Sequence, residues 1–483
     1  MRTKNAIAGA ACVLLSACSL APDYKVPETQ TVASYKETGQ WTAGTPQDAL
    51  PRGPWWSIYK DATLDNLESQ IESANPSLAQ AVARYDAAQG YLGEFQSGLF
   101  PTLTAGGHAD TDKQSAHRPL RSAGQPTYYG DDLAGVALSW DIDLWGRIRN
   151  EVAAGKAEAQ SSFADLQAIR LSLQARLADQ YLALRGLDAQ ASLLRDAAGV
   201  YQKALDLTNY RHGKGIASGL DVGRAQAQYS SAEAQLSEVL AGRALLEHSI
   251  ASLVGTPASN FGIPVAAVDF QIPNVPTGVP STLLQRRPDV AAAERIVAAT
   301  NAGIGVARAA FYPDISLSAL AGFQNTGNDG LFTAPNAFWA LGPDMALTVF
   351  DAGRHEGELA VAKAQNASAA AAYRAAVLRA FQEVEDNLAL LNRLSDEATA
   401  EATAETAATR TADLALALYR NGALSFLDVV VAQTTALQAR QAVLSLQTRR
   451  LQASVDLIRA IGGGWSDRQM PYSAEADKKP APT

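Results

Sequence analysis

The sequence contains very little cysteine. Of its 483 residues only two are cysteines, Cys12 and Cys18, and both lie close to the N-terminus. Two cysteines in this position cannot form the disulfide framework that stabilises many small exported domains. An exported chain of this kind must therefore be stabilised by a large hydrophobic core or by oligomerisation.

The sequence also lacks a long apolar run. The stretch from Ala6 to Ala17 is too short to span a bilayer as a helix, and no later segment is continuously apolar over the roughly 18 residues that a span needs. Because Arg2 and Lys4 precede it, this stretch is typical of a secretory signal peptide. The rest of the chain, with 47% hydrophobic and 18% charged residues, has the composition of a globular protein.

Basic charge is scarce relative to acidic charge. The formal net charge of −9 argues against a nucleic-acid partner, which would need a basic surface. Catalytic signatures are missing as well, since neither a Gly-x-Ser-x-Gly nor a Walker motif occurs. The five histidines lie far apart, and His355-Glu356-Gly357-Glu358 fits a charged helix start better than a metal site. We therefore expect no enzymatic activity, no cofactor and no bound metal.

The signal peptide ends in Leu15-Ser16-Ala17-Cys18, which resembles a bacterial lipobox. In such a motif the peptidase cleaves before the cysteine, and the cysteine thiol receives a diacylglyceryl group. Ser19 follows, and a non-acidic residue there resembles the pattern of lipoproteins sent to the outer membrane. We expect a signal peptide at 1–17, lipidation of Cys18 and an extended lipidated segment at 18–60. The alternative is an ordinary signal peptide with an incidental cysteine.

Most of the remaining chain consists of one sequence unit that occurs twice. YRHGKGIASGLDV at Tyr210–Val222 is echoed by YRNGALSFLDV at Tyr419–Val429. Upstream, the same spacing separates Pro76 from Phe100-Pro101 and Pro288 from Tyr312-Pro313. Such self-similarity indicates an internal duplication. The predicted boundaries are a first repeat at 61–264, a linker at 265–281, a second repeat at 282–464 and a tail at 465–483.

Each repeat contains two strand-like stretches in which apolar residues alternate with small or acidic ones. The first strands are expected at 102–110 and 314–324, followed by loops at 111–130 and 325–336 and by second strands. We expect one face to meet lipid and the other to meet water; Leu138, Trp140, Leu341 and Leu347 belong to the first, Asp141 and Asp344 to the second. Hairpins in a soluble sandwich are the alternative. Four strands cannot close a barrel, so in a membrane several protomers must pool their strands.

A helical run of unusual length follows each strand pair. Between Gly146 and Tyr210 there is no proline, and apolar residues recur at steps of three and four. A helix of this length would reach roughly 100 Å. Gly213 and Gly422 are expected to end the ascending helices, and Ser218 and Ser425 to cap the returning ones. The repeated turn is thus the tip of a long helical hairpin.

These features together resemble the TolC-type outer-membrane efflux proteins, in particular the lipoprotein branch (NodT-type) that serves resistance-nodulation-division pumps. The resemblance rests on the lipidated start at Cys18–Pro27, on Trp55-Trp56 with Asn75, and on Arg286-Arg287-Pro288-Asp289-Val290 followed by Phe311-Tyr312-Pro313. It implies a mainly α fold with a membrane β-barrel portion. Three protomers of four strands would form a 12-stranded barrel, and their helical hairpins a periplasmic tunnel.

The resemblance also implies a periplasmic gate in the second hairpin turn, formed by Tyr419, Gly422, Leu427 and Asp428. Relatives can carry a basic residue two positions after the glycine and a second acid three positions after the first. This chain has Leu424 and Val431 there. Links made by those two charges are therefore not expected here.

The function implied by the resemblance is that of an exit duct, which passively conducts drugs or other small toxic compounds across the outer membrane. The implied partners are two further copies of the chain, a periplasmic adaptor, an inner-membrane pump and outer-membrane lipid. Heavy-metal efflux and type I protein secretion remain alternatives, since their outer components look alike. A non-conducting coiled-coil scaffold lipoprotein is an alternative of another class, but it leaves the alternating strands unexplained.

Overall fold

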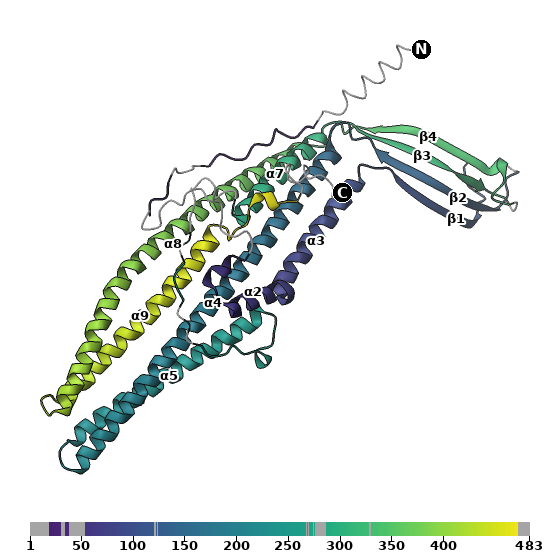
Figure 1. Ribbon diagram of the computed structural model, residues 1–483. Coiled ribbons are helices and arrows are strands. Elements are labelled where there is room, and N and C mark those ends of the chain that lie inside the picture. The colour runs from purple at the N-terminus through teal and green to yellow at the C-terminus, as the bar shows by residue number, and fades with distance from the viewer. Residues whose placement is uncertain are drawn as a thin grey trace, which may run out of the picture. The chain divides into compact units, whose positions relative to one another are not determined.

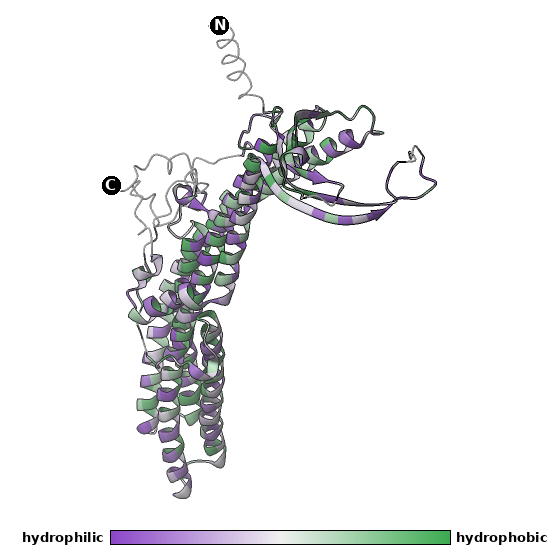
Figure 2. Ribbon diagram, turned by 90° about the vertical axis from the view of Figure 1, so that its right-hand side faces the viewer, coloured by the Kyte–Doolittle hydropathy of each residue, from purple (hydrophilic) through white to green (hydrophobic). Residues whose placement is uncertain are grey.

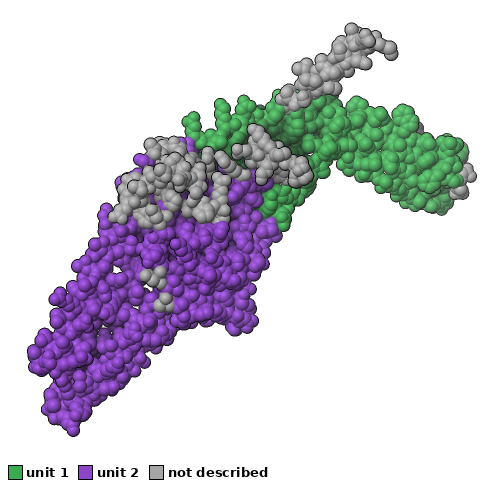
Figure 3. Space-filling view, in the orientation of Figure 1, with its two compact units in different colours: residues 1–28, 85–162, 293–373 green, residues 29–84, 163–292, 374–483 purple. Residues whose placement is uncertain are grey.

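The computed structural model describes residues 19–29, 34–37, 54–119, 122, 124–266, 268, 270–273, 275, 286–327 and 330–471. The chain divides into two compact units, and each draws on both sequence repeats (Figure 3). The first unit comprises 1–28, 85–162 and 293–373, and the second comprises 29–84, 163–292 and 374–483. The predicted signal peptide and Cys18 lie outside the described residues.

The first unit contains a four-stranded antiparallel sheet with the strand order β1-β2-β3-β4 (Figure 1). Its strands are β1 (Thr102–Lys113), β2 (Tyr128–Asp141), β3 (Asp314–Asn325) and β4 (Ala337–Ala346). The two hairpins come from different repeats, and β2 pairs with β3 to join them. β1 and β2 are longer than predicted, because Lys113 still pairs with Tyr128 where a loop was expected.

The register places the apolar residues of all four strands in common rows. Leu103 lies opposite Leu138, Leu138 opposite Ala319, and Ala319 opposite Leu341. Since neighbouring residues of a strand point to opposite faces, Trp140 shares the face of this row. The row of Asp141, Ser316 and Asp344 lies on the other face. The predicted separation of the two faces holds for these rows, although Leu133, Leu320 and Phe338 also lie on the second face.

The prediction that Leu347 is a strand residue is wrong. β4 ends at Ala346, so Leu347, which was expected to be a lipid-facing strand residue, lies beyond it. The reason is the pairing with β3. That strand begins at Asp314, opposite Ala346, and the residue before it is Pro313, which has no backbone N–H to donate, so Leu347 has no partner there. Further on, the carboxylate of Asp351 accepts a hydrogen bond from the backbone N–H of His355 at 3.0 Å at the start of α8 (Arg354–Arg420).

Two helical hairpins make up most of the described chain. The first consists of α4 (Arg147–Gly213) and α5 (Gly219–Leu253), and the second of α8 and α9 (Phe426–Ala460). α4 and α8 each run without interruption for 67 residues, and α5 and α9 for 35. At about 1.5 Å per residue, 67 residues reach roughly 100 Å. The prediction of single long helices is confirmed.

The remaining elements are short helices and helical turns. They are η2 (Trp55–Tyr59), α2 (Ala62–Ala74), α3 (Pro76–Ser97), η3 (Ala258–Asn260), α7 (Pro288–Ala309), η4 (Ala334–Asn336) and η5 (Asp467–Gln469). Among the helices of the described residues, none is both long enough and apolar enough to cross a lipid bilayer.

The helices of the second unit pack closely because many of their residues are small. An added Cβ at Gly186 of α4 would lie 2.2 Å from Oγ1 of Thr448 in α9, so the two helices approach to a distance that only glycine allows. Leu177 and Leu184 of α4 and Ile250 of α5 are completely buried. Figure 2 shows hydrophobic and hydrophilic residues interleaved along these helices. Apolar residues are thus not confined to one stripe of each helix, because each helix packs against several neighbours.

A buried ion network fixes the chain that leaves the first hairpin. The carboxylate of Asp188 pairs with Arg185 at 3.0 Å and with Arg243 of α5 at 2.7 Å. The two guanidinium groups also donate to the carbonyl oxygens of Pro264 and Ile263, at 2.7 and 2.6 Å. Because every charge has partners, the network compensates the cost of burying it.

The segment that follows Cys18 is held within the first unit. The hydroxyl of Ser19 donates to Oδ1 of Asn150 at 2.9 Å, and the guanidinium of Arg308 donates to the carbonyl oxygen of Leu20 at 3.0 Å. Ser19 and Leu20 therefore lie against α4 and α7 through specific hydrogen bonds. A lipid attached at Cys18 would be tethered through this segment.

Candidate functional site at the helical tips

The two hairpin tips are built in the same way. Each ascending helix ends in a turn whose left-handed residue is a glycine, Gly215 with φ +76° and Gly422 with φ +77°. A hydrogen bond spanning five residues closes each turn, from Ile216 N to Arg211 O in the first and from Ala423 N to Leu418 O in the second, both at 2.9 Å. This is the pattern of a helix C-cap.

Gly422 takes the left-handed position as predicted, and Gly213 ends α4 as predicted but is not itself left-handed. Gly213 is still the last residue of α4, and the left-handed position is taken by Gly215, two residues later. The sequence Gly213-Lys214-Gly215 offers two glycines that could adopt the left-handed conformation. The second one adopts it, so the helix continues through the first. Helix propagation adds one backbone hydrogen bond per residue, which favours the longer helix.

The repeated Leu-Asp-Val motif is explained by a capping box at the start of each returning helix. In the second tip, the hydroxyl of Ser425 donates to Oδ2 of Asp428 at 2.6 Å, and the N–H of Asp428 donates back to Oγ of Ser425 at 3.4 Å. Ser218 and Asp221 make the same pair of bonds in the first tip, at 2.8 and 3.1 Å. The predicted serine caps are confirmed.

The apolar side chains of the two tips form one cluster. Leu205 and Ala225 of the first hairpin pack together with side chains of the second, among them Tyr419, Phe426 and Val429. The rings of Tyr419 and Phe426 are 5.4 Å apart. This cluster joins the hairpins at their ends.

A cation from the first hairpin lies over an aromatic ring of the second. The guanidinium carbon of Arg211 is 4.8 Å from the ring centroid of Tyr419, which is the geometry of a cation–π contact. Arg211 is not among the predicted gate residues. The signal that could have found it is the dipeptide Tyr-Arg, which precedes both turns as Tyr210-Arg211 and Tyr419-Arg420.

The four predicted gate residues occupy different environments. Tyr419 is buried, with 8% of its surface exposed, whereas Leu427 is 44% exposed and Gly422 and Asp428 are exposed. Leu424 is partly buried against the apolar cluster. The tip therefore offers an aromatic residue held by packing and a carboxylate that faces solvent.

Metal binding finds no support in the described part of the chain. No group of three or more metal-binding side chains occurs among the described residues. His355 instead pairs with Asp351, four residues earlier, at 3.1 Å. Its other ring nitrogen lies 2.9 Å from Nη2 of Arg354. The histidine thus belongs to the start of α8.

The chain is similar in sequence to outer-membrane components of efflux pumps. The family described as "Outer membrane efflux protein" matches residues 67–256 and 279–463. The antibiotic efflux pump outer membrane protein ArpC of Pseudomonas putida is 30% identical over 458 residues, which are 94% of each chain. The pyoverdine export outer membrane protein OpmQ of Pseudomonas aeruginosa is 31% identical over 484 residues, 97% of this chain and 99% of the relative.

Solved structures of outer-membrane channels are similar to the chain over nearly its whole length. The channel OprN is 29% identical with a TM-score of 0.84, and the match covers 93% of this chain and all of OprN. The open state of the MtrE channel of Neisseria gonorrhoeae is 25% identical with a TM-score of 0.81, and the match covers 92% of this chain and 98% of MtrE. The duplication, the four strands and the long hairpins are thus features shared with these channels.

Proposed function

The chain belongs to the outer membrane efflux protein family, and on this premise we propose that it is the exit duct of a tripartite efflux system. It would passively conduct small toxic compounds across the outer membrane and would carry out no chemical reaction itself. The observation that supports this most directly is the sheet. On one face of the four strands, every residue from the row of Ala134 and Phe323 to the row of Trp140 and Leu317 is apolar or glycine, as a surface in contact with lipid requires.

We propose that the functional unit is a homotrimer. β1 and β4 are the outer strands of the sheet, and their outward backbone groups need hydrogen-bond partners if they lie in lipid. Pairing β1 of one copy with β4 of the next satisfies these groups. Three copies close a 12-stranded barrel, within the range of sizes that bacterial barrels adopt.

A duct of this kind needs other proteins to drive transport. The chain contains no nucleotide-binding motif, so the energy must come from an inner-membrane pump, in our proposal one of the resistance-nodulation-division type. A periplasmic adaptor would connect the two. We propose that adaptor or pump engages the helical tips and separates the second hairpin from the first.

The gate in this proposal is the second hairpin tip. Tyr419, Gly422 and Leu427 would form the constriction, and Asp428 would contribute one carboxylate per protomer. Three carboxylates near one axis attract cations and repel anions. Since Val431 is apolar, the ring would hold three charges and produce modest cation selectivity.

Single-channel recording tests this function. The purified full-length protein, inserted in planar bilayers, should show rare openings with modest cation selectivity. A scaffold lipoprotein would show no conductance at any voltage, and that result would refute the proposal. The named relatives export an antibiotic and pyoverdine, so we favour small organic compounds over metal ions or proteins as cargo. Accumulation of a fluorescent drug, a metal ion and a secreted protein in a deletion strain distinguishes the three.

A further inference from the structure

The two hairpins of the sheet have the same register. Thr102 and Asp314, which begin β1 and β3, each directly follow the proline of an aromatic-Pro pair. Thr102 pairs with Ser139 of β2, and Asp314 pairs with Ala346 of β4. Ser139 and Ala346 also correspond to each other, because each lies the same number of residues before the Gly-Arg pair that starts the following long helix. The hairpins β1–β2 and β3–β4 are therefore equivalent residue by residue.

A closed barrel of three copies contains two kinds of junction between hairpins. Within one copy β2 pairs with β3, and there Ser139 lies opposite Ser318. Between copies, in the homotrimer proposed above, β4 pairs with β1 of the next copy. Both junctions join the last strand of one hairpin to the first strand of an equivalent hairpin. Because the tilt and the stagger of strands are linked in a barrel, an even tilt requires the same register at both junctions.

Transferring the register of the β2–β3 junction to the boundary between copies gives definite partners. Ser139 corresponds to Ala346, and Ser318 corresponds to Gly106, since both are the fifth residue of their strands. Ala346 should therefore lie opposite Gly106 of the next copy. Two residues further along, Asp344 should lie opposite His108 of the next copy. We refer to this pairing as the transferred register.

The faces and charges of the strands disfavour the neighbouring registers. A slip of one residue would turn every side chain of β1 to the wrong face, so the nearest competitors are slips of two residues. One of these slips would place Asp344 opposite Asp110, and like charges in directly opposed positions are destabilising. The other would place Asp344 opposite Gly106, which has no side chain. Of the three registers, the transferred one gives Asp344 a partner that can donate a hydrogen bond.

His108 is placed to accept such a partner from the next copy. Its Nε2 lies 3.8 Å from Oδ2 of Asp131 on β2, which is beyond hydrogen-bond distance, and its side chain is 46% exposed. β2 lies on one side of β1, and the other side of β1 is an edge of the sheet. The carboxylate of Asp344 accepts a hydrogen bond from the hydroxyl of Ser318 and has lone pairs left for a second donor. An imidazole N–H and a carboxylate thus face the same boundary from its two sides.

We propose that β4 of one copy pairs with β1 of the next in the transferred register, and that His108 and Asp344 form a hydrogen-bonded pair across each boundary. This inference rests on the proposed homotrimer and adds which residues meet. Directly opposed residues have Cβ atoms about 4.5–5.5 Å apart, which an imidazole and a carboxylate can bridge. The partner of this surface is therefore a second copy of the chain, and the pair favours the correct register over a slipped one.

Disulfide cross-linking of the full-length protein in the outer membrane tests the register. Ala346→Cys combined with Gly106→Cys puts cysteines at opposed positions of neighbouring copies, and an added Cβ at Gly106 meets nothing within 4 Å. In a single copy the two positions lie on opposite edge strands, so they should not react with each other. A mild oxidant should therefore produce covalent dimers and trimers on non-reducing electrophoresis. Ala340→Cys with Asp112→Cys repeats the test near the other end of the strands, should the first pair impair assembly.

Two control variants keep Ala346→Cys and move the second cysteine by two residues, to Thr104→Cys or to His108→Cys. All these positions lie on the same face of the sheet. The controls nevertheless place the cysteines diagonally, about 7–8 Å apart, which exceeds the usual separation in a disulfide. Their cross-linking should be about fivefold weaker or less than that of the opposed pair. Cys18 is common to all variants and does not affect the comparison.

Heat dissociation tests the side-chain pair itself. His108→Gln and Asp344→Asn should each lower the temperature at which the trimer dissociates on seminative electrophoresis. The double variant should dissociate at about the temperature of the weaker single variant, because both changes remove the same interaction. Additive lowering of the temperature would show that the two side chains do not interact and would overturn the pair.

The cross-links also separate this inference from the proposed function. Stronger cross-linking by a shifted control than by the opposed pair, or equal cross-linking by all pairs, would overturn the transferred register but leave the trimer in place. Absence of cross-links between copies in every variant would contradict the closed barrel, and with it both the proposed trimer and the pairing across its boundaries.

Discussion

Arg211 and Tyr419 join the tips of the two helical hairpins through a cation–π contact, with the guanidinium carbon 4.8 Å from the ring centroid. The contact links the hairpin that carries the proposed gate to its neighbour within the same chain. It uses the face of the ring and a charge, not a hydrogen bond between side chains. Leu424 and Val431, near the same turn, are apolar.

Removing the charge of Arg211 should favour the open gate. Arg211→Gln loses a contact worth about 0.5–1 kcal/mol per protomer. Three protomers acting together should increase the open population on the order of tenfold or more. Open probability in planar bilayers measures the change. Arg211→Lys retains a cation and should stay close to the parent; equal opening of both variants would show that charge at this position does not hold the tip.

The two capping boxes allow the charge of Asp428 to be separated from its role in the helix. Asp428→Asn keeps an oxygen that can accept from Ser425, so the helix start should be preserved. If three Asp428 carboxylates form a ring, the variant should lose most of the cation preference. Reversal potentials in a salt gradient measure this. Asp221→Asn alters the matching cap of the first hairpin and should leave selectivity unchanged. If this variant loses cation preference instead, the ring of carboxylates lies at the first hairpin tip and not at the second.

The faces of the sheet predict opposite effects for neighbouring residues of β4. Leu341 lies on the apolar face and is 64% exposed, whereas Ala340 lies on the other face. Arginine on a lipid-facing strand costs about 2–4 kcal/mol near the midplane, and a trimer repeats this cost three times. Leu341→Arg should therefore deplete trimers from the outer membrane, as measured by seminative electrophoresis. Ala340→Arg should assemble normally and reduce cation conductance, and the reverse pattern would invert the assigned faces.

The lipid anchor remains a prediction, since Cys18 lies outside the described residues. Cys18→Ala should abolish incorporation of radioactive palmitate. Cys12→Ala changes the other cysteine, which cleavage would remove, and should label like the parent. Labelling that persists in Cys18→Ala contradicts the lipobox assignment. Some conductance should survive without the acyl group, because the sheet itself provides a far larger apolar surface than one anchor.

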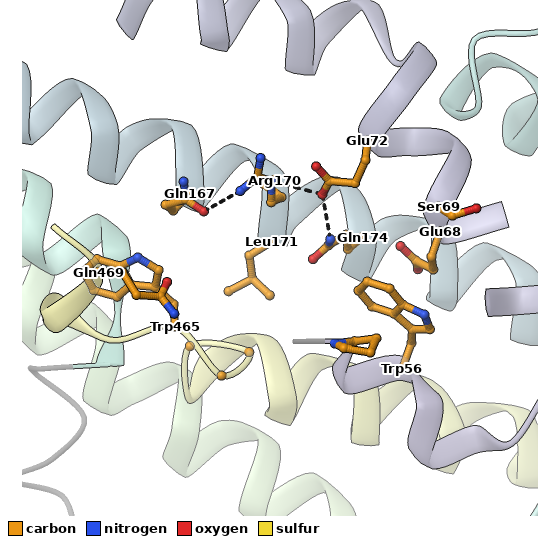
Figure 4. Close-up of a pocket in the computed structure, with 14 residues that line it drawn as sticks. Trp56, Glu68, Ser69, Glu72, Gln167, Arg170, Leu171, Gln174, Trp465 and Gln469 are labelled. Carbon is orange, nitrogen blue, oxygen red and sulfur yellow. Dashed lines mark hydrogen bonds and ion pairs between the residues drawn. The ribbon is translucent and has the colours of Figure 1, made fainter. Parts of the chain in front are cut away.

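The surroundings of Glu68 and the tip contact of Arg211 show the same limit of sequence reasoning. Glu68 lies on the face of α2 that also carries Leu64, Leu67 and Ile71, so its helical position indicates burial, but nothing near it in the chain indicates that its carboxyl group will have no partner among the described residues. Its surroundings include α4 and the segment near Trp465, which are distant in sequence (Figure 4). The partner of Arg211 is likewise about two hundred residues away along the chain.

The sequence by itself determined the elements of this protein. Long stretches without proline determined the two helices of 67 residues, alternation determined the faces of the sheet, and Ser218 and Ser425 determined where the returning helices begin. These features depend on residues close together in the chain, whose backbone hydrogen bonds and side-chain periodicity are local. Only the tertiary structure decided the end of β4, the surroundings of Glu68 and the pairing of Arg211 with Tyr419. Those depend on which distant surfaces meet and on the charges and water that are excluded when they do.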